Sequence, residues 1–245
     1  SFICTILQGE PSKCFDQYKN LLEEMISHNM SRKDAIIALG GGVVGDLAGF
    51  VAASYMRGID FYNIPTTVLS QVDSSVGGKV AIDMGSYKNI VGAFWQPKTV
   101  IIDPNVLSTL SLRQQHNGLC EALKMGLILD DHLVSLFEQE TIDIDAIITR
   151  SIELKRDVVQ QDERESNLRK ILNFGHTIGH AIESAYGLNT YLHGECVAMG
   201  MLFFIEDKTL KQRVLNIYKK LDLPQVPNYD TSTLLEYVTH DKKSS

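Results

Sequence analysis

The segment between residues 35 and 56 constrains the fold more strongly than any other part of the sequence. An apolar run of strand length, 35–39, ends in Gly40-Gly41-Gly42 and is followed at 43–56 by small residues with helical spacing. Strand-like runs follow at 61–64 and 99–102, while a β-rich run at 2–7 and a helical pattern at 13–28 precede the segment. A strand, a glycine turn, a helix and a second strand, in this order, are typical of a βαβ unit in a parallel sheet. We therefore predict an α/β fold for the N-terminal part.

The second half of the chain has a different pattern. Strand-like runs disappear after about residue 105, and helical spacing takes their place. We predict helices at 112–128, 131–139, 143–160, 167–186, 194–206 and 208–221. The sequence therefore predicts two domains, an α/β domain at 1–104 and an all-helical domain at 105–245. A boundary of this kind commonly borders a ligand cleft.

Composition excludes several functional classes. The chain has 23 Lys and Arg residues against 30 Asp and Glu residues, a net charge of −7. Because it also lacks a basic run, we expect no binding to nucleic acid or to an anionic membrane. Its four cysteines are scattered without a Cys-x-x-Cys pair, which is typical of free thiols in the cytoplasm. No apolar run approaches the roughly 18 residues of a membrane span, so we expect a soluble cytoplasmic protein.

The glycine loop GGGVVGD, at 40–46, lies between the predicted buried strand and the predicted helix. Bare glycines allow the backbone to approach a pyrophosphate, and the helix N-terminus offers N–H groups and the positive end of the helix dipole. The spacing differs from the G-x-G-x-x-G register, so a simple tight turn is an alternative. Asp46 fits either interpretation, because an acidic residue is common in the first turn of a helix.

A second glycine-rich segment, DSSVGGK at 73–79, places a glycine pair directly before Lys79. Exposed backbone beside a lysine is typical of an anion site, although a polar surface turn with a solvated lysine would have the same sequence. The spacing differs from that of the Walker A motif, which excludes a P-loop NTPase.

A polar stripe on the predicted helix 167–186 is the strongest indication of a functional site. At 100° per residue its side chains fall within about 80° of one another. They are Arg169, Asn173, His176, His180 and Glu183. The other faces are apolar, and Gly175 and Gly179 would let neighbouring helices approach closely.

A buried ionisable stripe has to be paired or bound to something, because isolated burial costs several kcal/mol. Two histidines four residues apart, followed by His193-Gly194-Glu195, favour a divalent metal site over a pair of core histidines. The spacing leaves the third ligand open. Glu121 and Lys124, three residues apart on the predicted helix 112–128, could equally form an ordinary exposed ion pair.

Together these motifs resemble those of the 3-dehydroquinate synthase family of the shikimate pathway. The matching text runs nearly from end to end and includes GEPSK, GGGVVGD, PTT, QVDSSVGGK, KNIVGAF, LCEALKMG, DERESNLRKILNFGHTIGHAIE, LHGE and the late DKK. The resemblance implies a Rossmann-like NAD-binding domain joined to a helical metal- and substrate-binding domain, as in glycerol dehydrogenases. It also implies that NAD and a divalent metal, zinc or cobalt, are required.

The resemblance implies a role for each matching residue. The metal ligands would be Glu121, His176 and His193. The substrate carboxylate would be clamped by Lys155 and Arg169, with Lys124 beside them. The phosphate would be held by Lys79, Asn89, Asn173, His180 and Lys242, with Arg57 reaching this site from the partner subunit of a homodimer. Asp73 would lie near the metal-bound hydroxyls, and Glu165 would belong to the surrounding polar network.

The resemblance also implies an NAD site in the first domain. Its ribose contacts would be Glu10 and Lys13. The pyrophosphate loop and the nicotinamide end would be formed by Gly41, Gly42, Val43, Val44, Gly45 and Asp46. The remaining contacts would be Thr66, Thr67, Lys79, Lys88, Val106, Leu107, Ser108 and Thr109.

The implied reaction converts the sugar phosphate 3-deoxy-D-arabino-heptulosonate 7-phosphate to 3-dehydroquinate and phosphate, a step of aromatic amino acid biosynthesis. It combines transient oxidation by NAD, phosphate elimination, reduction and an intramolecular aldol cyclisation, so the enzyme would be a carbon–oxygen lyase. Another sugar phosphate cyclase and a metal-dependent polyol dehydrogenase are alternatives, but the former would not need a carboxylate clamp. The family's first strands are missing before Ser1 and the 205–215 segment looks short, so we expect an incomplete N-terminus and unrepresented loops or tails.

Overall fold

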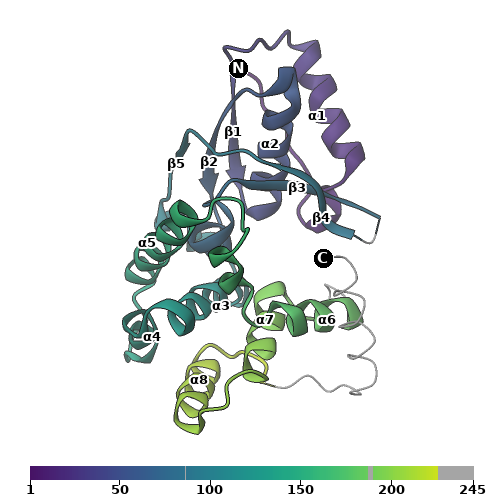
Figure 1. Ribbon diagram of the computed structural model, residues 1–245. Coiled ribbons are helices and arrows are strands. Elements are labelled where there is room, and N and C mark those ends of the chain that lie inside the picture. Colours follow the sequence, from purple (N-terminus) through teal and green to yellow (C-terminus); the bar gives the residue numbers. More distant parts are fainter. Residues whose placement is uncertain (86, 187–189, 226–245) are drawn as a thin grey trace. The chain divides into compact units, whose positions relative to one another are not determined.

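The computed structural model describes residues 1–85, 87–186 and 190–225 (Figure 1). It divides into two compact units, and the division falls between Thr109 and Leu110. Within the described residues, no helix combines the length and the apolar character that crossing a bilayer requires.

The first unit contains the predicted parallel sheet. Its strands are β1 (Ala35–Gly40), β2 (Asp60–Pro65) and β5 (Thr99–Val100), in the order β1-β2-β5. Helix α2 (Gly42–Ser54) connects β1 to β2, whose parallel register ends with Gly40 opposite Pro65. The strand, glycine turn, helix and strand predicted from the sequence are thus confirmed. The turns after β1 and β2 consequently leave the same edge of the sheet, which is where ligands bind in open α/β sheets.

Helix α2 forms the centre of the first unit's core. Around it lie the sheet, helix α1 (Phe15–Ser27) and an antiparallel hairpin of β3 (Lys79–Met84) and β4 (Tyr87–Phe94) (Figure 1). The contact with β3 is close, because a Cβ on Gly49 would lie 2.4 Å from Val80 Cγ1. The buried side chains in this core include Leu47, Val51, Phe61 and Ile82.

Two strand predictions need correction in the first unit, and one hairpin was missed. Residues 2–7 form no strand: Phe2 and Ile6 pack on the core, while Ile3 is 90% exposed and no strand pairing holds this backbone among the described residues. The predicted strand 99–102 is only two residues long as β5, although Ile101 N–H still donates to the Asn63 carbonyl. The hairpin of β3 and β4 was not predicted.

The second unit consists of helices throughout its described residues. They are α3 (Leu112–Leu129), α4 (Asp131–Glu138), α5 (Ile144–Gln161), α6 (His176–Tyr186), α7 (His193–Leu202) and α8 (Lys208–Lys220). Helices α3, α4 and α5 bury Leu123, Phe137 and Ile147 completely. Helix α8 is tied to α7 by Tyr218, whose buried hydroxyl donates to the Ala198 carbonyl at 2.6 Å.

The predicted helix 167–186 is wrong as a single element. Leu168–Asn173 forms a short 3-10 helix, and α6 begins only at His176. The interruption lies at Gly175, whose φ of 78° is incompatible with a continuous right-handed helix. Arg169 and Asn173 therefore do not share a helical face with His176, whereas His176, His180 and Glu183 do.

The predicted role of Gly175 and Gly179 in close helix approach is confirmed. A Cβ on Gly179 would lie 3.1 Å from the Cys196 carbonyl oxygen, and a Cβ on Gly200 would lie 2.1 Å from the Gly175 carbonyl oxygen. The backbones of α6 and α7 are thus in direct contact. This contact brings the first residues of both helices, His176 and His193, near each other.

Candidate functional site

A cluster of potential metal ligands lies in the second unit where α3, α6 and α7 meet. Glu121 comes from the middle of α3, while His176 and His193 are the first residues of α6 and α7. The Nε2 atoms of both histidines lie 3.7 Å from Glu121 Oε1. Glu121 is 1% exposed, so the carboxylate that faces the two rings is itself shielded from bulk solvent.

The hydrogen bonds of the two rings determine which nitrogen faces Glu121. His176 Nδ1 lies 3.2 Å from the Phe174 carbonyl oxygen, which can only accept, so this Nδ1 carries the proton. His193 Nδ1 lies 3.2 Å from Glu183 Oε2 and is likewise the donor. When each ring is neutral, its Nε2 lone pair is thus directed to the same side as Glu121 Oε1. Fixing Nδ1 by an acceptor is the usual way in which a protein orients a metal-binding histidine.

The pKa values of the two histidines are shifted in opposite directions. Burial lowers the pKa of His176 to about 4, because desolvation of the imidazolium outweighs the attraction of Glu121. Burial also disfavours charged His193, but its hydrogen bond with Glu183 and the charges of Glu121 and Glu183 outweigh this effect and raise its pKa. His176 is therefore a neutral ligand donor at pH 7, whereas a cation at His193 competes with a proton that this ring holds more tightly than a free imidazole does.

The donor set fits a divalent transition metal. A tetrahedral ion with bonds of about 2.0–2.1 Å separates its ligand atoms by about 3.4 Å, close to the observed 3.7 Å. His180 adds a third imidazole, since one nitrogen from each of His176, His180 and His193 lies within 4.8 Å of the others. Two ligand triads are therefore geometrically available, and they differ in whether Glu121 or the exposed His180 is the third ligand.

Three buried cations of the second unit were predicted to contact substrate. Lys124 Nζ donates to Glu121 Oε2 within α3, so its ammonium group lies directly beside the histidine cluster. Lys155, in α5, is 5% exposed and Arg169 is 3% exposed. Arg169 is fixed at both ends, because its backbone N–H donates to Asp162 and its Nη1 donates to the Glu163 carbonyl at 2.6 Å.

The turn before Arg169 is held together by hydrogen bonds to one carboxylate. The backbone N–H groups of Arg169, Asn167 and Ser166 donate to the Asp162 carboxylate and hold its pKa well below the usual range. Two further predicted residues, Asn173 and Glu165, are joined by a 3.2 Å hydrogen bond from Asn173 Nδ2 to Glu165 Oε1. Asn173 and His180 are exposed.

In the first unit, the predicted nucleotide loop has the local structure that anion binding requires. Helix α2 begins at Gly42, and no side chain caps its N-terminus at Gly41. A Cβ on Gly41 would lie 3.0 Å from Thr67 Cγ2, and one on Gly42 would lie 3.1 Å from Ser74 Oγ. The glycines therefore keep the backbone of this turn close to the neighbouring polar loops, with the first N–H groups of the helix directed outward.

Lys13 is the centre of a charged cluster in the same unit. Its buried ammonium group lies 2.7 Å from Glu10 Oε1, 3.3 Å from Asp46 Oδ2 and 2.7 Å from Asn89 Oδ1. Asp83, 3.9 Å away, accepts a hydrogen bond from the Asn89 backbone N–H, and its place in this cluster was not predicted. The structure thus brings together predicted ribose and phosphate residues that are far apart in the sequence.

Burial controls the charges of this cluster. It raises the pKa of Asp46 to about 6, against the opposing attraction of Lys13. Burial also raises the pKa of Asp83. The pKa of Lys13 is raised despite burial, because the carboxylates of Asp46 and Glu10 outweigh desolvation of the ammonium group.

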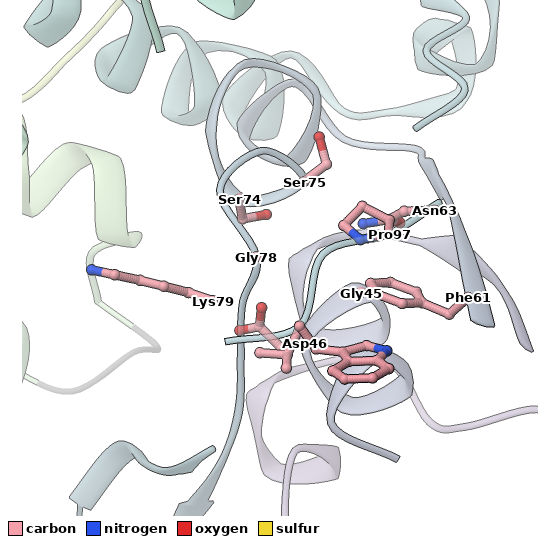
Figure 2. A pocket seen from close by; sticks show the side chains of 11 residues that line it. Gly45, Asp46, Phe61, Asn63, Ser74, Ser75, Gly78, Lys79 and Pro97 are labelled. Atoms are coloured by element: carbon pink, nitrogen blue, oxygen red, sulfur yellow. The ribbon is translucent and has the colours of Figure 1, made fainter. Parts of the chain in front are cut away.

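A pocket beside this cluster lies between α2, β2 and the turn 74–79 (Figure 2). Its polar lining includes Asp46, Asn63, Ser74 and Ser75. Figure 2 shows the Lys79 side chain extending away from the other labelled side chains.

The other predicted site residues of the first unit lie around its loops. Thr66 and Thr67 directly follow β2, and Thr66 N–H donates to the Gly40 carbonyl at the end of β1. Asp73 lies in a π-helical turn (Ser70–Ser74), Lys88 lies in β4, and the stretch 106–109 lies in a 3-10 helix (Pro104–Thr109). Arg57 is exposed and has a φ of 68°. Lys242 lies outside the described residues.

Comparison with known proteins identifies the family. The family model "3-dehydroquinate synthase N-terminal" matches residues 3–117, and the model "3-dehydroquinate synthase C-terminal" matches residues 118–244. The 3-dehydroquinate synthase of Caldanaerobacter subterraneus subsp. tengcongensis is 49% identical over 96% of this chain and 71% of the relative. That of Geotalea uraniireducens is 45% identical over 96% of this chain and 70% of the relative.

Solved structures give the same fold. A 2-epi-5-epi-valiolone synthase from Streptomyces hygroscopicus subsp. jinggangensis, solved with NAD⁺ and Zn²⁺, has a TM-score of 0.90 and 26% identity over 98% of this chain and 72% of that chain. A 2-deoxy-scyllo-inosose synthase, solved with carbaglucose-6-phosphate, NAD⁺ and Co²⁺, has a TM-score of 0.84 and 30% identity over 95% of this chain and 68% of that chain. A glycerol dehydrogenase from Schizosaccharomyces pombe, 18% identical with a TM-score of 0.62 over 93% of this chain and 66% of that chain, shares the fold. The predicted fold class and the resemblance are confirmed, and the chain belongs to the 3-dehydroquinate synthase family.

Proposed function

We propose that this chain converts 3-deoxy-D-arabino-heptulosonate 7-phosphate to 3-dehydroquinate and phosphate, as a carbon–oxygen lyase that depends on NAD and a divalent metal. One observation carries the proposal: Nε2 of His176 and Nε2 of His193 both lie 3.7 Å from the buried Glu121 Oε1. Two imidazoles and a carboxylate around one point are a common ligand set of catalytic metals. Membership of the family supports the proposed substrate.

The metal in this proposal is zinc or cobalt, the ions with which two related cyclases were solved. When bound, the metal would polarise substrate hydroxyl groups, and NAD would reversibly accept a hydride. We choose Glu121 rather than His180 as the third ligand because Glu121 is buried and Lys124 holds its second oxygen. The exposed His180 would then be accessible to the substrate phosphate.

Arg169 and Lys155 would bind the substrate carboxylate. An arginine can bind a carboxylate through two parallel hydrogen bonds, and Arg169 is preoriented by its contacts with the 162–163 turn. Both side chains are almost fully buried, so a carboxylate that reaches them loses water and its attraction to them is strengthened. A substrate without this carboxylate would make no ionic contact with these two side chains.

The phosphate would be bound by Asn173 and His180 of the second unit, with Lys79, Asn89, Lys242 and the partner subunit's Arg57 as further contacts. Together with Glu165 and Asp73 they complete the proposed substrate site. Binding at both the carboxylate and the phosphate would hold the sugar in one orientation through every step, and such orientation can supply much of the rate.

NAD would bind at the edge of the parallel sheet in the first unit. The uncapped N-terminus of α2 would receive the pyrophosphate, and Glu10 and Lys13 would contact a ribose. Gly41 to Asp46, Thr66, Thr67, Lys79, Lys88 and the stretch 106–109 would form the rest of the site. The proposal assigns NAD binding to 1–104 and metal and substrate binding to 105–245, in a cytoplasmic homodimer. Four free cysteines support the cytoplasm.

Release of inorganic phosphate from the heptulosonate phosphate tests the proposed function. We expect release to require NAD, to stop with a chelator and to return with Zn²⁺ or Co²⁺, without accumulation of NADH. Phosphate release from glucose 6-phosphate instead would identify a cyclase for substrates without a carboxylate. A steady rise of NADH with a simple polyol would identify a polyol dehydrogenase.

Two arginine variants test the carboxylate clamp. Arg169→Ala should lower kcat/KM for the heptulosonate phosphate by about 10–100-fold, the cost of losing a charged hydrogen-bonding partner. Arg164→Ala removes an exposed arginine of the same segment and should have little effect. If kcat/KM fell equally in the two variants, Arg169 would not be a substrate-binding residue.

A further inference from the structure

One face of α3 carries three polar residues at intervals of one helical turn: Arg113, Asn117 and Glu121. Glu121 is the proposed metal ligand, and the other two have no role in the proposed reaction. Asn117 is 6% exposed, while the Arg113 side chain is about half exposed. Both residues contact the chain segment 190–195, which carries the proposed metal ligand His193.

Arg113 binds the first turn of α7 through a two-pronged ion pair. Its Nε lies 2.7 Å from Glu195 Oε1 and its Nη2 lies 2.8 Å from Glu195 Oε2. The same Nη2 donates to the Thr190 carbonyl at 2.9 Å. Glu195 Oε2 in turn accepts a 2.8 Å hydrogen bond from the Leu192 backbone N–H. Glu195 already caps its own helix through Leu192, so the arginine adds a tie between helices that capping does not require.

Asn117 makes a second tie on the other side of His193. Its Oδ1 accepts a hydrogen bond from the Gly194 backbone N–H at 2.7 Å. The two backbones are in contact here, since a Cβ on Gly194 would lie 2.0 Å from the Asn117 carbonyl oxygen. The backbone N–H after His193 thus donates to Asn117 of α3, and the backbone N–H before it donates to Glu195, which Arg113 of α3 binds. Glu183 holds the imidazole ring itself through Nδ1.

We propose that Arg113 and Asn117 are positioning residues of the metal site, which fix the backbone of His193 at a set distance from Glu121. The inference rests on the proposed function, because it takes Glu121, His176 and His193 as ligands. The helix acts as a common support: the same rigid element carries one ligand and the two side chains that locate another. Outer contacts of this kind typically change metal affinity by about 10–100-fold.

The chain offers a matched control for Arg113. Arg213, on α8, forms a similar two-pronged pair with Glu138, at 2.8 Å from Nε to Oε1 and 3.0 Å from Nη2 to Oε2. This pair ties α8 to α4 and involves none of the proposed ligands. Replacing either arginine by lysine keeps the charge and removes the fork. A purely structural role would make the two variants alike.

The experiment measures the dissociation constants of Zn²⁺ and Co²⁺ for the full chain by competition with a chromophoric chelator. We expect Arg113→Lys to weaken binding by about 10–100-fold and to alter the Co²⁺ absorption spectrum, and Arg213→Lys to stay near the wild type. Asn117→Ala, the second variant, should also weaken binding while its helical circular dichroism persists. Unchanged affinity in Arg113→Lys and Asn117→Ala, or an equal loss in Arg213→Lys, would overturn the positioning role.

The same measurement separates this inference from the proposed function. If the wild type binds no divalent metal tightly, the proposed metal site fails and the positioning role fails with it. If the wild type binds metal and releases phosphate from the heptulosonate phosphate, but the variants bind metal equally well, only the positioning role is refuted.

Discussion

The charged cluster around Lys13 allows us to predict how Asp46→Asn changes the free energy of unfolding at different pH values. Burial raises the pKa of Asp46 to about 6 in the folded chain, from the ordinary value of 3.8. A difference of about 2 pH units corresponds to about 3 kcal/mol, at 1.36 kcal/mol per unit. Asparagine resembles the protonated acid but does not titrate. Glu10 and Asp83 remain beside the ammonium group in the variant, so the loss of one carboxylate does not leave Lys13 isolated.

The raised pKa of Asp46 determines how the free energy of unfolding changes with pH. Below pH 3.8 Asp46 is protonated in both the folded and the unfolded chain, so its burial does not lower the stability of the fold through a buried charge. Between pH 4 and 6 the unfolded chain loses this proton first, so the free energy of unfolding falls as pH rises. Above about pH 6 the full cost of the buried carboxylate is present. Asp46→Asn should therefore match the wild type near pH 4 and exceed it by up to about 3 kcal/mol at pH 7.

This difference in the free energy of unfolding between variant and wild type is measured by urea unfolding of the NAD-free chain, followed by the fluorescence of its single tryptophan. Trp95 borders the same pocket as Asp46. Asp34→Asn is a control with the opposite pH dependence. The N–H and hydroxyl of Ser31 lower the pKa of Asp34, so the wild type gains stability as pH rises from 3 to 6 and this variant should become less stable relative to it. The reasoning would be refuted if the difference in the free energy of unfolding between Asp46→Asn and the wild type stayed constant or became smaller between pH 4 and 7.

Three further predictions concern the second unit. His176→Ala should abolish tight binding of a divalent metal while keeping most of the helical circular dichroism; a variant that retains stoichiometric zinc after dialysis would contradict the ligand assignment. Gly200→Ala should lower the free energy of unfolding in urea by about 3 kcal/mol or more, because the new methyl group would lie 2.1 Å from the Gly175 carbonyl oxygen; an unchanged midpoint would disprove the close contact. Arg213→Ala removes exposed ion pairs with Glu138 and Asp131 and should cost less than about 1 kcal/mol, as measured by the same unfolding curves.

The sequence predicted the fold where the signal was local. The glycine turn between β1 and α2 and the apolar run before it are sufficient to indicate a βαβ unit. The hairpin of β3 and β4 was missed because its glycines and polar residues suggested a turn, although Val80 and Ile82 alternate with more exposed residues as a strand requires. The break at Gly175 was missed because helical spacing continues on both sides of it.

The candidate site was harder to predict than the fold because its members come from separate elements. The spacing of His176 and His180 pointed to a metal, but both the third ligand and the exclusion of His180 came from the family resemblance. Asp83, Arg113 and Asn117 gave no signal at all. Each of them acts through a partner that is distant in the sequence, and only the packing of the helices and the hairpin brings these partners together.

The meeting of α3, α6 and α7 at Glu121, His176 and His193 has a thermodynamic consequence. A cation bound to all three would add a cross-link to segments that side-chain hydrogen bonds, an ion pair and close backbone packing already join, and it would have no equivalent site in the unfolded chain. Folding of the helical half and metal availability then form a single linked equilibrium. At a free metal concentration one thousand times its dissociation constant, the linkage adds about 4 kcal/mol to the stability of that half. Starvation for the metal would therefore deplete the folded enzyme as well as its activity.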